Sequence, residues 1–197
     1  QYISSFLEND YTIVLYTQDS PGKNTTRSLS EIISPGTYIE DEVTAISNIT
    51  LCIWLEYTKP RNQIQESLTI GVSSIDVFTG ITTMSESTIK YNHSPNNYDQ
   101  LEQLISVYNP RESIIISNLD YNIINEIKLY IGLDNRKCYI VEYTKESYLL
   151  ANYVENSHKQ NYQLASLIKY YPNISQEVIE QEILYVYGIA LQSFVVL

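Results

Sequence analysis

The sequence predicts a mixed α/β fold, in which a sheet of antiparallel and parallel strands is flanked by helices. Three observations predict it: strand-like runs between residues 49 and 84, alternating helical and strand patterns up to residue 143, and a helical pattern after residue 146. Strands joined by short turns pair antiparallel, whereas strands separated by a helix pair parallel. The hydrophobic share of 44% is sufficient for a packed core.

The first forty residues predict two strands that precede this sheet. Residues 11–17 are β-branched and aromatic, which favours a strand, and residues 20–24 form a loop rich in turn-forming residues. Residues 27–33 predict a second strand. The acidic stretch 38–48 predicts a linker or a short helix.

A sharp turn ends the second strand at Ser34-Pro35-Gly36-Thr37. Proline presets the φ angle at the second position of a turn, and glycine accepts the positive φ that often follows. We therefore expect Pro35 to start the turn and Gly36 to adopt a positive φ.

Three strands in succession predict an antiparallel meander. Their ranges are 49–57, 68–78 and 81–84, with a polar turn at 58–65. The second and third strands are joined by a turn that ends in Thr79-Gly80. Asp76 is expected to support this turn by hydrogen bonding to it.

Helical and strand patterns then alternate. Apolar residues at helical spacing between Leu101 and Tyr108 predict a helix that ends at Pro110. Residues 113–117 contain three consecutive isoleucines, which is typical of a strand buried on both faces. A second helix over residues 123–131 is stopped by Gly132, and a strand follows at residues 138–143.

The remaining residues, 146–197, predict helices. Ser175 is expected to cap the last one, whose apolar stripe contains the residues listed here: Ile179, Ile183, Val186, Ala190 and Leu191. From residue 49 the order is therefore β-β-β-α-β-α-β-α. This is the order of a ribonuclease H-like mixed sheet with helices on its faces.

Two stretches carry a resemblance to a known family. Residues 27–37, ending in Ser34-Pro35-Gly36-Thr37, and residues 74–80, with Asp76, Thr79 and Gly80, resemble the junction between the first two domains of MutS, the DNA mismatch repair protein. That family opens its second, connector domain after a strand that ends in Thr/Ser-Pro-Gly-Thr. The family's connector domain is known to have the ribonuclease H-like fold.

Further passages extend the resemblance over most of the chain. Residues 5–14 resemble the end of the family's mismatch-recognition domain, although Thr17-Gln18 stands where the family has Glu-Gln. Residues 101–117, with Asn109-Pro110-Arg111-Glu112 at their centre, resemble a helix-Asn-Pro-x-Glu-strand passage, and residues 188–192 resemble the helix that leads into the lever domain. Within the family, these passages resemble the giant-virus and coral-mitochondrial type of MutS.

The resemblance implies three regions and a function. Residues 1–44 would be the end of the mismatch-recognition domain with a linker, residues 45–170 the connector domain, and residues 171–197 a helical transition toward the lever domain. The chain, which starts with Gln1, is then expected to be a fragment of a longer DNA-dependent ATPase. The connector would relay the ATP and mismatch state between domains and dock a MutL-like partner.

The same resemblance implies which cofactors and partners the parent protein uses and which site residues this chain contributes. The parent protein would act as a dimer on mismatched DNA and would use ATP and Mg²⁺. Within this chain we expect no catalytic, cofactor-binding or metal-binding residue. The site residues are structural and belong to the two interdomain turns, with the members Ser34, Pro35, Gly36, Thr37, Asp76, Thr79 and Gly80.

Charge and cysteine content narrow the partners and the compartment. The formal net charge is −11, from 23 acidic and 12 basic residues, and the bases are scattered, which disfavours direct binding to duplex DNA. Cys52 and Cys138 lie in apolar runs and are expected to be buried and reduced, which indicates an intracellular compartment. The sequence does not distinguish among a virus factory, a nucleus and a mitochondrion as the compartment. No signal peptide or long apolar span indicates a membrane.

Other interpretations remain. One alternative is a metal-dependent nuclease, because a ribonuclease H-like sheet would carry Asp76 and Glu56 on neighbouring strands. That chemistry needs more converging carboxylates than these two. A third interpretation is a scaffold domain that is unrelated to this family. Phe6-Leu7-Glu8 has the form of a mismatch-binding wedge, but Ile3, Phe6 and Leu7 share a helical face, so Phe6 is expected in a helix core.

Overall fold

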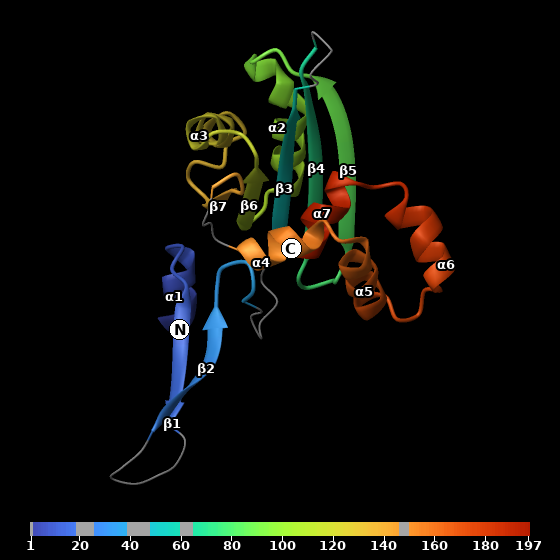
Figure 1. Cartoon of the computed structure of the whole chain (residues 1–197). Coiled ribbons are helices and arrows are strands. Elements are labelled where there is room, and N and C mark those ends of the chain that lie inside the picture. Colours follow the sequence, from blue (N-terminus) through green and yellow to red (C-terminus); the bar gives the residue numbers. More distant parts are fainter. Residues whose placement is uncertain (1, 19–25, 39–47, 60–64, 146–149) are drawn as a thin grey trace.

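The computed structural model describes residues 2–18, 26–38, 48–59, 65–145 and 150–197. The predicted loop at 20–24 and most of the predicted linker at 38–48 lie outside these residues. The described part consists of a five-stranded mixed sheet with helices on both faces and a separate two-stranded hairpin (Figure 1). The predicted mixed α/β fold is confirmed.

The N-terminal part is a short helix followed by an antiparallel hairpin. Helix α1 spans Tyr2–Glu8, strand β1 spans Ile13–Gln18 and strand β2 spans Arg27–Ile33. The hairpin extends away from the sheet (Figure 1). Apart from Ile33, the residues of β2 are exposed, because the described residues pack little against this ribbon.

The sheet has the strand order β5-β4-β3-β6-β7. The strands are β3 (Ile49–Thr58), β4 (Ser67–Asp76), β5 (Thr82–Lys90), β6 (Glu112–Ser117) and β7 (Lys137–Glu142). Neighbours β3, β4 and β5 pair antiparallel, whereas β6 pairs parallel with both β3 and β7. The meander and the parallel strands are thus where the sequence predicts them.

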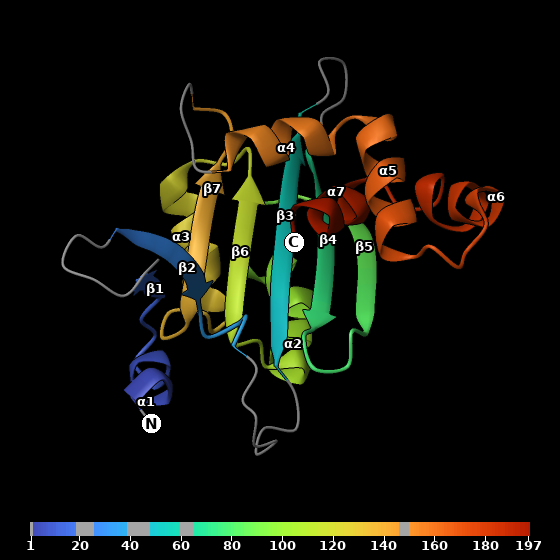
Figure 2. The ribbon, with the colours of Figure 1, turned by 90° about the horizontal axis from the view of Figure 1, so that it is seen from below.

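Helices cover the two faces of the sheet separately (Figure 2). The 3₁₀ helix η1 (Pro95–Tyr98), α2 (Asp99–Tyr108) and α3 (Tyr121–Tyr130) lie on one face. On the other face lie α4 (Ala151–Ser157) and α7 (Ile189–Val196), with α5 (Gln160–Tyr170) beside them. Successive residues of a strand point to opposite faces. Accordingly, Leu51 and Ile53 belong to the first core, and Cys52 and Trp54 belong to the second.

The edge strand β5 is longer than predicted. It continues past Met84 to Lys90 and pairs with β4 along its whole length, from Ile75 opposite Thr82 to Ser67 opposite Lys90. The side chains from Ser85 to Lys90 are polar except for Ile89, and they are exposed or half-buried, so this part of the strand has no hydrophobic pattern that predicts it.

The predicted last helix is wrong as a continuous element. Helix α6 (Gln176–Ile179) continues into the π-helical turn η2 (Glu180–Leu184), and α7 starts anew after Gly188. The Glu86 carboxylate on β5 accepts hydrogen bonds from the backbone N–H groups of Gly188 and Ala190, at 3.0 and 2.9 Å. This anion holds the start of α7. Val186, which lies between η2 and α7, is 59% exposed, so the predicted stripe is interrupted there. Ser175 does precede α6, but its side chain makes no capping hydrogen bond.

Two further expectations concern single side chains. Phe6 lies on a helix, as predicted, but it is 54% exposed, so its assignment to a helix core is wrong; Leu7 is the buried residue of α1. Cys52 is buried, Cys138 is half-buried, and both are free thiols. Within the described ranges, no helix is long and apolar enough to cross a membrane.

Candidate functional site: the junction between the hairpin and the sheet

The turn after β2 is closed by its own residues. The backbone N–H groups of Thr37 and Tyr38 both donate to the Ser34 carbonyl at 3.1 Å. The Ser34 N–H donates in return to the Thr37 hydroxyl at 3.0 Å. The predicted turn residues Ser34, Pro35, Gly36 and Thr37 therefore form one compact unit.

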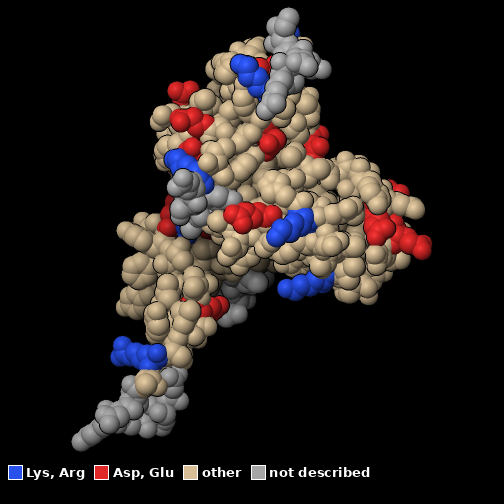
Figure 3. Space-filling model, in the orientation of Figure 1, with Lys and Arg blue, Asp and Glu red and all other residues tan. Residues whose placement is uncertain are grey.

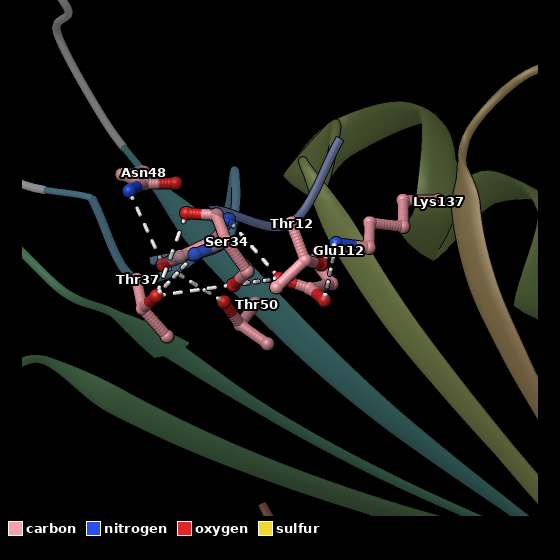
Figure 4. Close-up of polar contacts among 8 residues, drawn as sticks. Thr12, Ser34, Thr37, Asn48, Thr50, Glu112 and Lys137 are labelled. Carbon is pink, nitrogen blue, oxygen red and sulfur yellow. Dashed lines mark hydrogen bonds and ion pairs between the residues drawn. The ribbon is translucent and has the colours of Figure 1, made fainter. Parts of the chain in front are cut away.

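A buried carboxylate attaches this turn to the sheet (Figure 4). Glu112 is the first residue of β6 and is 7% exposed. Its Oε2 accepts hydrogen bonds from the Ser34 hydroxyl at 2.6 Å and from the Gly36 N–H at 3.1 Å. Lys137 of β7 places its Nζ 3.7 Å from Glu112 Oε1 and donates to the Thr12 hydroxyl before β1. A buried charge is stable only when paired and hydrogen-bonded, and these partners satisfy it.

Position 36 requires glycine because Glu112 and Thr50 lie close to its Cα atom, and not because of its backbone angle. Among the described residues, the glycines with positive φ are Gly80 and Gly132, so the expected positive φ at Gly36 is wrong. A Cβ atom at position 36 would lie 2.6 Å from Glu112 Oε2 and 2.7 Å from Thr50 Oγ1. Only a residue without a side chain lets Glu112 reach the turn.

Asn48 joins the two turns that the sequence singled out. Its side-chain amide donates to the carbonyls of Gly36 and Tyr38, both at 3.2 Å. Its backbone N–H donates to Asp76 Oδ1 at 3.4 Å, and its carbonyl accepts from the Val77 N–H at 2.9 Å. Asn48 is fully buried, so both turns are held by one ordered residue.

The second turn has the hydrogen bonding that the sequence predicts for Asp76. The Phe78 N–H donates to Asp76 Oδ1 at 3.0 Å, and the Gly80 N–H donates to the Asp76 carbonyl at 2.8 Å. Burial by itself would raise the pKa of Asp76. Hydrogen bonds from Phe78, Asn48 and Thr79 outweigh it and hold that pKa below its ordinary value. Gly80 has a φ of 70°, which the turn requires.

A cleft lies beside this junction, among α1, the turn at Pro35 and the segments that precede β6 and β7. It has a volume of about 560 Å³, and its lining includes Leu7, Pro35, Arg111 and Arg136. The Arg136 guanidinium donates to the Pro110 carbonyl at 2.9 Å. Beside this cleft, polar contacts of Glu112, Asn48 and Lys137 join the N-terminal part of the chain to the sheet.

The two carboxylates of the nuclease alternative lie far apart. Asp76 is opposite Ile49, whereas Glu56 is opposite Thr69, seven residues further along β3. At about 3.4 Å per residue, this separation is roughly 24 Å. Glu56 instead accepts hydrogen bonds from Trp54 and Tyr143. Among the residues that the structure describes, no three His, Cys, Asp or Glu side chains are placed to hold a metal ion.

Sequence reasoning missed Glu112 and Asn48 as members of this site. Glu112 stood in the Asn-Pro-x-Glu passage, and a charged residue two positions before three consecutive isoleucines was the available signal. Its partner Gly36 is 76 positions away, and no local pattern reveals such a contact.

The described residues form a mixed α/β domain, to which a preceding hairpin is attached through the buried carboxylate of Glu112. The chain is 30% identical over 175 residues to the putative DNA mismatch repair protein mutS homolog L359 of Acanthamoeba polyphaga mimivirus. The match covers 86% of this chain and 16% of that protein. No protein-family profile matches the chain. The similarity establishes a relationship between this chain and the MutS family, with a relative from a giant virus.

Proposed function

We propose that this chain is the connector region of a MutS-type mismatch repair ATPase, with residues 1–44, 45–170 and 171–197 as the end of the mismatch-recognition domain, the connector domain and the transition toward the lever. The connector relays the ATP and mismatch state between domains and docks a MutL-like partner. The longer protein acts as a dimer on mismatched DNA with ATP and Mg²⁺. The sheet is of the ribonuclease H-like class.

The observation that carries this proposal is the junction at Glu112. A relay must transmit a displacement, and a turn held by a buried carboxylate moves together with the strand that bears it. Ser34 and Gly36 are held in this way to β6, and Asn48 extends the connection to the turn at Asp76. A displacement of the hairpin therefore reaches both β6 and the meander.

The surface of the hairpin supports its assignment to another domain. Val14, Leu29 and Ile32 are 47%, 53% and 58% exposed on a ribbon of only two strands. Two-stranded ribbons are marginal by themselves and are stabilised by packing against further structure. The remainder of a mismatch-recognition domain would cover these side chains.

The charge of the chain supports a protein partner. Lys and Arg side chains are scattered over the face shown in Figure 3, and acidic side chains gather over α6 and η2, which contain Glu177, Glu180 and Glu182. A net charge of −11 repels the phosphates of DNA and attracts a basic protein surface.

The test is mismatch-dependent ATP turnover in the longer protein that carries this chain. Gly36→Val drives a branched side chain into Glu112 and Thr50, so we expect mismatched DNA to stimulate turnover less, while turnover without DNA is retained. Gly132→Ala is the matched control, because position 132 lies after α3, outside both turns, and an added Cβ there meets no atom within 4 Å. Normal stimulation in Gly36→Val would contradict the proposed relay.

A further inference from the structure

A small aromatic pocket lies between η1 and α3, on the face of the sheet that α2 and α3 cover. Its volume is about 190 Å³, and its walls include Tyr91, His93, Tyr98 and Tyr130. Pockets for drug-sized ligands start at about 300 Å³, so this pocket is suited to one amino-acid side chain.

The rings that form the walls are held in place. Tyr91 and Tyr98 are 5% and 6% exposed, and the Tyr98 hydroxyl donates to the Tyr91 hydroxyl at 3.1 Å. The His93 ring packs on Tyr91 with 4.5 Å between centroids, and Tyr130 meets Tyr98 edge-on at 6.3 Å. The Tyr130 hydroxyl donates to Asp99 at 2.5 Å, which fixes that ring at the rim. The pocket is therefore formed before any ligand arrives.

A carboxylate at the rim gives the pocket a negative charge. Glu126 is exposed, lines the pocket, and forms no ion pair with any Lys, Arg or His among the described residues. Burial is the main cause of the raised pKa of Tyr98, and the charge of Glu126 contributes to it. The negative charge of Glu126 therefore reaches the Tyr98 hydroxyl inside the pocket.

We propose that this pocket binds the unmodified side chain of a lysine or arginine of a protein partner. Aromatic rings attract cations through their π-electron faces, and a nearby carboxylate adds direct charge attraction. The net charge of −11 favours a partner with a basic surface. The inference deepens the proposed docking role by naming the chemistry of the partner's anchor, and only the partner's biological identity rests on that role.

The experiment is a titration of the 197-residue chain with three capped amino acids, followed by NMR of its labelled tyrosine rings. The probes are the N-acetyl amides of arginine, lysine and norleucine; norleucine has a similar aliphatic chain and no charge. We expect saturable shifts of Tyr91, Tyr98 and Tyr130 with a cationic probe and none with norleucine. Glu126→Gln should weaken the binding about fivefold, because it removes one charge at the rim.

Glu155→Gln is the matched control, since Glu155 is an exposed glutamate of α4 on the opposite face. It should leave the affinity unchanged. Equal shifts with norleucine, no saturable shift with any probe, or equal weakening by both variants would overturn the proposal. Tighter binding of N-acetyl-trimethyllysine amide than of the unmodified probes would overturn the choice of an unmodified side chain. None of these results depends on mismatch-dependent ATP turnover, so the two proposals fail separately.

Discussion

Replacing Gly36 with alanine should detach the hairpin turn from the sheet while the sheet stays folded. The new methyl group would lie 2.6 Å from Glu112 Oε2 and would displace the carboxylate that accepts from Ser34 and from the amide of residue 36. Hydrogen bonds to charged groups contribute about 1.5 to 3 kcal/mol each. We therefore expect a net loss of about 3 kcal/mol, the lower end of this range for two bonds.

Amide hydrogen exchange measures this loss directly. A change of about 3 kcal/mol corresponds to roughly a hundredfold faster exchange of the backbone amide at position 36. Amides in the centre of β3 and β6 should keep their protection, because no contact of the central strands is changed.

Gly132→Ala separates this local effect from a general one. Position 132 lies after α3, outside the junction, and has a φ of 74° and open space around an added Cβ, so alanine there costs only backbone strain, about 1 to 2 kcal/mol. Exchange at position 36 should stay as in the unchanged protein. Unaltered exchange at position 36 in Gly36→Ala, or the same acceleration in both variants, would refute the reasoning.

Three further predictions follow from other parts of the fold. Gly71→Ala should lower the free energy of unfolding by about 3 kcal/mol in a urea titration, because its Cβ would lie 2.5 Å from a backbone nitrogen of α7. Burial raises the pKa of Cys52, and that of Cys138 to about 11, so both thiols should react slowly with iodoacetamide at neutral pH until the chain is unfolded. A hydrogen bond from Lys59 is the main cause that lowers the pKa of Glu66 to about 2. The stabilising contribution of this carboxylate is therefore present above its unfolded pKa of about 4.3 and is lost as the pH falls toward 2. Glu66→Gln should make the urea midpoint less dependent on pH between these two values.

Each of these predictions has a clear opposing result. An unchanged urea midpoint in Gly71→Ala would mean that α7 does not press on β4. Fast labelling of Cys52 in the folded chain would contradict its burial, and an equally steep acid dependence in Glu66→Gln would assign that dependence to other groups.

The sheet could be predicted because its strands carry strong local patterns. The predicted bounds 49–57 and 113–117 agree with β3 and β6 to within one residue, since runs rich in isoleucine and other apolar residues favour strands. The break before α7 could not be predicted. It depends on Glu86, a residue of an edge strand about a hundred positions away, which captures the N–H groups of Gly188 and Ala190.

The candidate site was predictable in its turns but not in the contacts that hold them. Pro35 and Gly80 indicate turns because proline fixes φ and glycine accepts a positive φ, and both are local properties. Glu112 and Asn48 form the junction through tertiary contacts, and these appear only when the chain is folded. For Gly36 the predicted turn was correct, but the predicted reason, a positive φ, was wrong. The glycine is needed because it makes room for Glu112.

The most direct test of the central claim, that the chain is the connector of a MutS-type ATPase, is to read the coding sequence beyond Leu197. The claim predicts a long helical region followed by a Gly-rich phosphate-binding loop with Gly-Lys-Ser/Thr. A reading frame that stops near Leu197 would contradict it, because no ATPase would then be present for this domain to couple.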